Sequence, residues 1–110
     1  MEHKIIHYHI DDIAIDPEDI CDSLNEACTK RQHRFRLRGI CQLENHVYFV
    51  MVPLRSGEPR EEYIITTLED ISHEGFIATV NNRYQGGFDV IGSFQVYETH
   101  MALFAKVLQD

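Results

Sequence analysis

The sequence lacks the features that would direct it to a membrane or an oxidising compartment. It has three cysteines in 110 residues, an odd number that cannot pair completely within one chain, and none is in a C-x-x-C spacing. No apolar run approaches the roughly 20 residues that span a bilayer. The N-terminus has no charged segment followed by an apolar run and a cleavage site. These absences predict a cytoplasmic protein with no disulfides and no membrane partner.

Cationic side chains and catalytic motifs are scarce as well. Ten Lys and Arg residues face 18 Asp and Glu residues, a net charge of −8, and this excess of negative charge argues against a nucleic-acid partner. The sequence has no Gly-rich phosphate loop and no Ser or Cys nucleophile with a recognisable base and orienting acid. We therefore expect no cofactor and favour a noncatalytic function over an enzymatic one.

What the sequence does contain is a repeat. Residues 35–42 (FRLRGICQ) match residues 88–95 (FDVIGSFQ) without a gap, 53 positions later, and the same spacing carries Leu24 onto Ile77. With 44% hydrophobic content, the chain has the size and composition of one globular domain. We predict a single domain over 1–110, made of repeat 1 (1–54) and repeat 2 (60–107), with a Pro- and Gly-containing linker between them.

Each repeat has the pattern of a strand, a helix and a hairpin. Residues 3–10 alternate with period two, and Asp16-Pro17 begins a helical stripe that contains Leu24. In residues 34–43, the alternation points Phe35, Leu37, Gly39, Cys41 and Leu43 inward, and Ile40 and Gln42 outward. The predicted elements are strands at 3–10, 34–43, 47–52, 61–68, 87–97 and 100–107, and helices at 17–32 and 70–85.

These elements predict an α+β fold. Two pseudo-symmetric β-α-β-β repeats would form a largely antiparallel six-stranded sheet with both helices on one face, a ferredoxin-like arrangement. Gly39 and Gly92 occupy equivalent positions and are expected to mark bends or close backbone approaches.

A family resemblance accompanies this pattern. Gly87-Phe88 after the second helix, Arg34-Phe35 at the same place in the first repeat, and the closing strand MALFAK carry it. The chain resembles the small, mostly bacterial domains of unknown function that consist of one β-α-β-β unit, here duplicated in tandem. The resemblance implies a duplicated fold and no catalytic residues.

Three arginines are the first candidate site. Arg34, Arg36 and Arg38 recur along one face of the predicted strand, and guanidinium groups bind carboxylates or phosphates in a bidentate manner. The alternative is that acidic residues on neighbouring strands neutralise them in exposed cross-strand pairs. The acidic candidates for such pairs are Asp89, Glu44, Glu61 and Glu62.

The helix-free face of the sheet is expected to carry further contact residues. Gln42 and Gln95 occupy equivalent outward positions, and Tyr97 follows them on the same face. A mixed polar and apolar surface of this kind is typical of an interface. We therefore expect the face to bind a protein partner or a small anionic ligand, with the chain forming a homodimer.

Histidines provide an alternative. His7 and His9 lie on one side of the first strand and could bind a metal ion or act as a general base in a small enzyme. His3 on the same side is about 13 Å from His7 at roughly 3.3 Å per residue, which is too far for a shared ion. Histidine is also common on half-exposed strands. A third alternative is a purely structural self-assembly domain.

Overall fold

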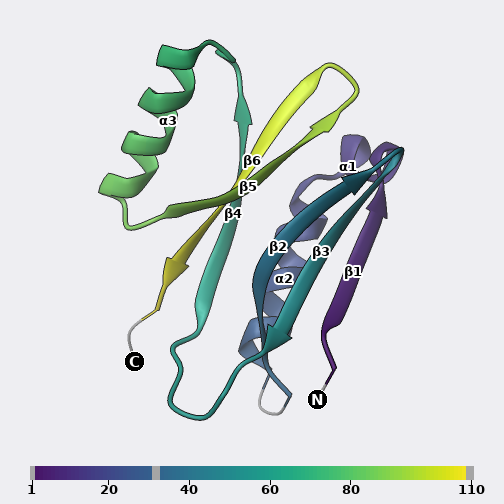
Figure 1. Cartoon of the computed structure of the whole chain (residues 1–110), viewed down its shortest axis with the longest axis vertical. Coiled ribbons are helices and arrows are strands. Elements are labelled where there is room, and N and C mark those ends of the chain that lie inside the picture. The colour runs from purple at the N-terminus through teal and green to yellow at the C-terminus, as the bar shows by residue number, and fades with distance from the viewer. Residues whose placement is uncertain (1, 31–32, 109–110) are drawn as a thin grey trace.

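The computed structural model describes residues 2–30 and 33–108. These residues form six strands and three helices (Figure 1). In chain order the elements are β1 (Lys4–His9), α1 (Ile10–Ile15), α2 (Glu18–Thr29), β2 (Phe35–Leu43), β3 (His46–Pro53), β4 (Glu61–Leu68), α3 (His73–Gln85), β5 (Asp89–Val96) and β6 (Thr99–Val107). The predicted α+β class is confirmed, and the predicted strand at 61–68 has the observed bounds.

The strands form two antiparallel sheets of three strands each. Sheet A has the order β1-β3-β2 and sheet B the order β4-β6-β5, and the two lie beside each other with β2 next to β5 (Figure 1). The prediction of one six-stranded sheet is therefore wrong. No ladder of backbone hydrogen bonds joins β2 to β5 in the described chain. The two edge strands contact each other through side chains instead.

The two halves nevertheless share their local geometry. In each, the last strand lies in the middle of the sheet and pairs with both others. Both hairpins turn over two residues, and the first residue of each turn has a positive φ, 54° at Glu44 and 55° at Tyr97. A β-bulge interrupts β2 between Leu37 and Gly39, and another interrupts β5 between Val90 and Gly92. The expected bends at the two glycines are confirmed.

The bulge in β2 reverses the faces of the residues that follow it. Leu37 pairs with buried Met51, but beyond the bulge Ile40 and Gln42 pair with buried Phe49 and Val47. Cys41 and Leu43 consequently point to the opposite face and are exposed. The predicted inward positions of Cys41 and Leu43, and the outward positions of Ile40 and Gln42, are wrong because one extra residue shifts the period-two alternation.

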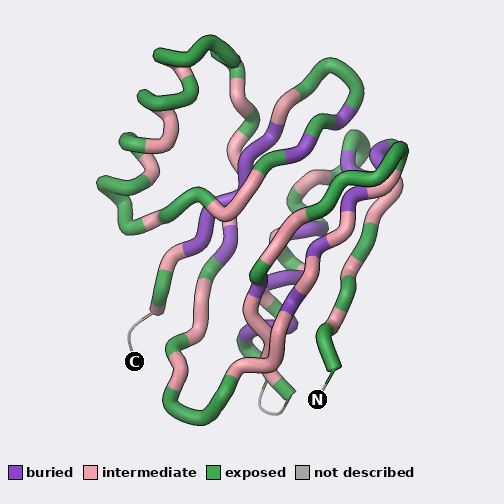
Figure 2. Tube along the Cα trace, in the orientation of Figure 1, coloured by how far each residue is buried: buried purple, intermediate pink, exposed green. Residues whose placement is uncertain are grey.

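Helix α1 was not predicted. His9 caps its start, since its Nδ1 accepts a hydrogen bond from the Asp11 backbone N–H (3.0 Å), and Ile10 and Ile13 of α1 are buried. A six-residue helix shows too little periodicity to be recognised from sequence. Its isoleucines join the core that sheet A, α2 and one face of sheet B share, shown as the buried segments in Figure 2.

Helix α2 packs at the junction of the two halves. Its buried residues Ile20, Leu24, Ala27 and Cys28 belong to the shared core. The Asn25 side chain bonds the edge strand β4, since its Oδ1 accepts from Tyr63 N–H (2.8 Å) and its Nδ2 donates to the Tyr63 carbonyl (3.3 Å). Phe49 of sheet A meets Phe94 of sheet B edge to face, with ring centroids 5.8 Å apart.

The predicted helix at 70–85 is confirmed as α3, but none of its 13 residues is buried. Ile77 is 43% exposed, whereas Leu24, 53 positions earlier, is fully buried. The prediction that both helices cover one sheet face in the same way is therefore wrong. Among the helices that the structure describes, none has the length and apolar character to cross a membrane.

Candidate functional site

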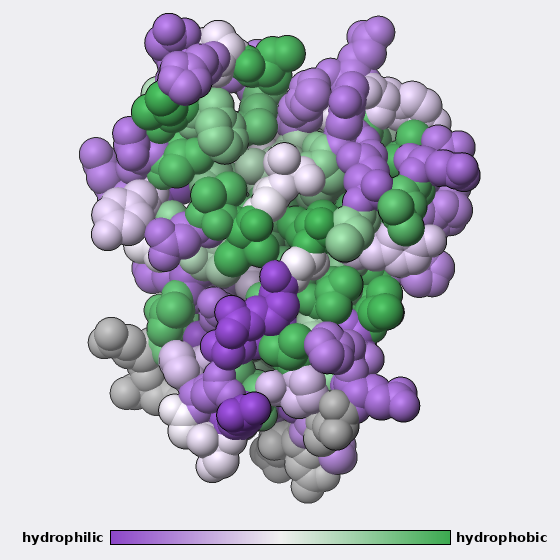
Figure 3. Space-filling model, viewed as in Figure 1, coloured by the Kyte–Doolittle hydropathy of each residue, from purple (hydrophilic) through white to green (hydrophobic). Residues whose placement is uncertain are grey.

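The outer face of sheet A, which α2 does not cover, carries a basic hollow of about 820 Å³ at its Pro53 end. We call it the arginine hollow. Strand β2 contributes Arg36 and Arg38, and the loop between β3 and β4 contributes the rest of one wall. The lining residues are His3, Arg36, Arg38, Val52, Pro53, Arg55, Ser56 and Glu58. In Figure 3, strongly hydrophilic side chains lie over this part of sheet A beside hydrophobic ones.

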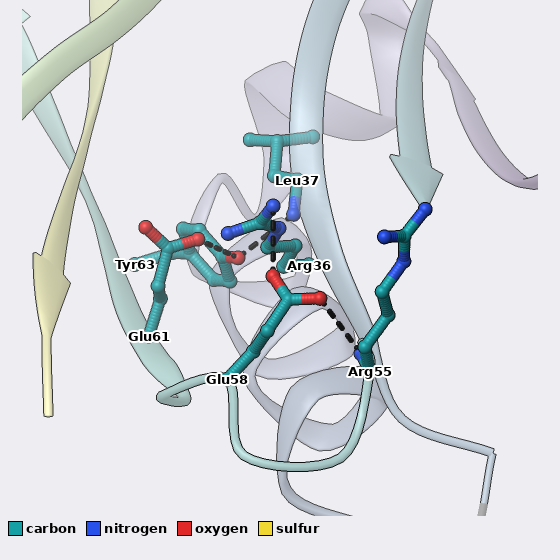
Figure 4. A network of polar contacts seen from close by, with 6 residues as sticks. All are labelled: Arg36, Leu37, Arg55, Glu58, Glu61 and Tyr63. Atoms are coloured by element: carbon teal, nitrogen blue, oxygen red, sulfur yellow. Dashed lines mark hydrogen bonds and ion pairs between the residues drawn. The ribbon is translucent and has the colours of Figure 1, made fainter. Parts of the chain in front are cut away.

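A polar network holds one wall of the hollow (Figure 4). The Arg36 Nη2 and Glu58 Oε2 atoms form an ion pair at 2.9 Å, and Glu58 Oε1 accepts a hydrogen bond from the Arg55 backbone N–H (3.0 Å). Both partners of the ion pair keep 25% of their side-chain surface exposed. Glu58 thus orients Arg36 and fixes the loop.

The wall is anchored to sheet B through Tyr63. This tyrosine is 1% exposed, and its hydroxyl accepts a hydrogen bond from Leu37 N–H (2.8 Å) and donates to Glu61 Oε1 (3.0 Å). Burial raises the pKa of the Tyr63 phenol well above its ordinary value, so the group stays neutral. Leu37 is adjacent to Arg36, and the backbone of the arginine strand is therefore held in place from the other half of the molecule (Figure 4).

The charges in the hollow do not balance. Arg36 has Glu58 as its partner, whereas Arg38 and Arg55 form no ion pair with any carboxylate among residues 2–30 and 33–108. Arg38 is exposed on the bulge. Two unneutralised guanidinium groups beside an oriented third give the hollow a local positive charge in a protein whose net charge is −8.

Arg34 does not line the hollow. Its Nε donates to the Lys30 carbonyl at the end of α2 (2.5 Å), and its own carbonyl accepts from Leu54 N–H (2.8 Å). Arg34 therefore closes the helix terminus. The carboxylate that pairs with Arg36 comes from Glu58 in the linker. None of the four acidic residues predicted from sequence takes that position, because Asp89, Glu61 and Glu62 lie on strands of sheet B and Glu44 lies in the turn at the far end of β2.

Gln42 and Gln95 do meet, but not on an outer face. The Gln42 Nε2 donates to the Gln95 carbonyl (2.5 Å) and its Oε1 accepts from Gln95 N–H (3.0 Å). One side-chain amide thus bonds a backbone peptide group across the junction of the sheets. The Gln95 side chain turns to the Tyr97 carbonyl instead (2.8 Å). Both amides have internal partners, and this pair links the two halves.

Tyr97 lies at the tip of the β5–β6 hairpin, where its hydroxyl bonds the Asp11 carboxylate of α1. It is not a lining residue of the arginine hollow. The sequence predicts Tyr97 beside the arginines only if the six strands form one sheet, and the structure has two.

The predicted histidines form an aromatic group with two residues of β3. His7 stacks on Tyr48 with centroids 5.6 Å apart, and His9 meets His46 edge to face at 5.1 Å. In the described part of the chain, no group of three or more His, Cys, Asp and Glu side chains is arranged to hold a metal ion. His9 Nδ1 already serves as the cap of α1, so the geometry favours a packing role for these rings.

Sequence reasoning missed Arg55 and Glu58. Both belong to the segment PLRSGEPR, which was interpreted as a joint between repeats. Glu58 N–H donates to the Arg55 carbonyl (3.1 Å), a turn that its Ser-Gly pair indicates. The sequence does offer a signal. Arg55 and Glu58 flank the turn, and the turn directly follows β3, the strand that pairs with the arginine-containing β2.

Comparisons with family models, with curated proteins and with solved structures find no match for this chain.

Proposed function

We propose that the protein is a noncatalytic module that binds a small anionic ligand, a carboxylate or a phosphate, in the arginine hollow. The observation that carries the proposal is the charge balance of the hollow. Arg38 and Arg55 have no carboxylate partner in the described chain. Arg36, which lines the same hollow, is held by its ion pair with Glu58. Like charges gathered in this way repel one another unless an anion joins them.

The geometry of the hollow suits a small ligand. Arginine donates through a planar fork, so adjacent guanidinium groups recognise oxygens of one carboxylate or phosphate. The bulge at Arg38 and the hydrogen bonds of Tyr63 fix the strand, which reduces the ordering cost of binding. His3 also lines the hollow and offers a ring nitrogen as a further hydrogen-bonding group.

A noncatalytic role fits the remaining polar groups. The thiol of Cys28 is buried, and burial raises the pKa of the Cys21 thiol to about 11, so neither is a ready nucleophile. His7 and His9 pack against aromatic neighbours. The alternative of a small enzyme with His7 or His9 as the base would not use the arginine hollow, since the histidine among its lining residues is His3.

We also infer a tandem duplication of a β-α-β-β unit. The common strand order and the bulges before Gly39 and Gly92 support it. The two units differ in their first connection, where α1 extends the first unit. Only the first unit has the arginines, since Asp89 and Ile91 stand at the positions of Arg36 and Arg38, and the proposed binding activity belongs to that unit alone.

The test is an NMR titration at low ionic strength with inorganic phosphate in one arm and citrate in the other. We expect the Nε–H signals of Arg36, Arg38 and Arg55 to shift with saturation in at least one arm. Arg38→Gln and Arg55→Gln should each raise the Kd about tenfold, since a charge-assisted hydrogen bond contributes roughly 1.5–3 kcal/mol. Sodium chloride at the same ionic strength should leave the three signals in place.

Lys30→Gln serves as the matched control. Lys30 is an exposed cation at the end of α2, away from the outer face of sheet A, and its loss should leave the Kd unchanged. Equal weakening by Lys30→Gln and Arg38→Gln would show that binding follows net charge and would contradict a defined site.

A further inference from the structure

Equivalent faces of the two sheets are covered to very different extents. Tyr48, Val50 and Val52 lie on the outer face of sheet A and are half-buried. The residues 53 positions later, Met101, Leu103 and Ala105, lie on the face of sheet B that packs into the shared core, and all are buried. The face of sheet B that packs into the core is therefore buried, whereas the equivalent face of sheet A is open to solvent.

The covered face shows what the open one is built to receive. In the chain, α2 and the inner face of sheet A pack against this face of sheet B: Phe49 meets Phe94, Ile40 packs on Gly92, where an added Cβ would lie 3.3 Å from the Ile40 Cδ1, and Asn25 bonds the β4 edge. A helix with its sheet thus docks on the outer face of the next sheet.

The second half has a helix that is open on its outer side, although the sheet face on the α3 side is closed at the central strand, where Ala102 and Phe104 are fully buried. On α3, Phe76 is 39% exposed and Ile77 is 43% exposed, and Val90 on the adjoining face of sheet B is 39% exposed. Figure 3 shows hydrophobic side chains gathered beside α3 and over β5 and β6. A helix of 13 residues gains most of its stability from packing an apolar face, and α3 has no buried residue with which to do so.

The open face of sheet A is apolar at matching positions. Ile5 on the edge strand β1 is 57% exposed and pairs with Val50. Both halves of an interface are therefore present on one chain, the exposed apolar side chains of α3 at one end and the outer face of sheet A at the other.

We propose that a second copy of this chain occupies the open face, with α3 of one protomer docked on the outer face of sheet A of its partner, as α2 docks on sheet B within the chain. The contact is head to tail and repeats the internal packing between copies. It covers Val52 at the edge of the arginine hollow, since the equivalent Ala105 is buried, and it leaves the positions of Arg36 and Pro53 open, because their equivalents Asp89 and Lys106 are exposed and half-buried.

Light scattering on the purified chain tests the contact. At about 100 µM, a concentration typical of weak interfaces, we expect the mass of at least two chains of 12.9 kDa. Phe76→Asp on α3 and Ile5→Asp on β1 should each reduce the mass to that of one chain. A 1:1 mixture of the two variants should restore a two-chain species, because one intact α3 and one intact outer face remain between them.

The mixture distinguishes this contact from a symmetric one. An interface between two α3 helices, or between two outer faces, needs the same surface intact in both copies, so the mixture would stay monomeric and the proposal would fail. A monomeric wild-type chain would also overturn it. Ile15→Asp is the control, since Ile15 is 83% exposed at the end of α1 and outside both surfaces, and its mass should equal that of the wild type.

Amide NMR spectra should show that the two variants keep the dispersion of the wild type, since Ile5 is 57% and Phe76 39% exposed and neither belongs to the buried core. A two-chain mixture of folded variants supports head-to-tail docking whether or not the hollow binds an anion. The anion titration measures the Nε–H signals of the arginines and the Kd of the Arg38→Gln variant. Each proposal can therefore fail without the other.

Discussion

The outer face of sheet A and its counterpart on sheet B have the same strand order and the same bulge, and they differ in what lies above them. Val50 is half-buried where Leu103 is fully buried. The difference shows that the side of the sheet to which a side chain points does not by itself decide whether it is buried. Burial follows from the layer that packs on the face, which is α2 and sheet A for Leu103 and, in a single chain, solvent for Val50.

The largest expected effect sets the two faces directly against each other. Leu103→Ala should lower the free energy of unfolding by about 3 kcal/mol, since it leaves a cavity in a closed core, whereas Val50→Ala should cost about 1 kcal/mol or less. Urea denaturation of dilute protein measures both. A cost for Val50→Ala as large as that of Leu103→Ala would remove the distinction between the faces.

The second test concerns Tyr63, which joins the covered face to sheet A. Tyr63→Phe removes the acceptor of the Leu37 N–H and leaves a buried donor without a partner, at a cost of about 1–3 kcal/mol. Tyr84→Phe is the control, because Tyr84 is 66% exposed and its change should be neutral. If the two substitutions had equal effects in urea denaturation, the anchoring role of the Tyr63 hydroxyl would be refuted.

A third test uses pH at the same junction. Burial raises the pKa of the Cys21 thiol to about 11 from 9.0, so the unfolded chain loses this proton first. The resulting stability is complete below pH 9 and is lost as the pH rises toward 11. Because the thiol is only half-buried, Cys21→Ala should remove about 1 kcal/mol of this alkaline loss. Parallel loss in both proteins between pH 8 and 11 would exclude Cys21 as its source.

The smallest effect is expected where the two sheet edges cross. Gln42→Ala removes the two hydrogen bonds to the Gln95 backbone, but these are exposed, so water replaces them and the cost should be about 0.5–1 kcal/mol. Hydrogen exchange of the Gln95 amide should also become faster. Unchanged exchange at Gln95 would show that the crossing is held by the apolar contacts alone.

Much of the local structure could be predicted from sequence. The alternation in residues 61–68 and the proline at the start of α2 indicate their elements directly, and the recurring glycines mark both bulges. Of the arginine site, Arg36 and Arg38 could be named, but Arg34 could not be separated from them. Its role at the end of α2 depends on where the chain turns back, and Glu58 approaches Arg36 from a loop 22 positions later.

The sequence by itself determined the six strands, the two longer helices and the residue types that recur 53 positions apart. Only the tertiary structure decided which faces are covered. A bulge reverses the direction of Cys41 and Gln42 without any change in the pattern of residue types. The first half packs on sheet B and buries Leu103, while Val50 stays accessible. An apolar face is buried only when another element packs on it, and the alternation of residues along a strand does not specify which element that is.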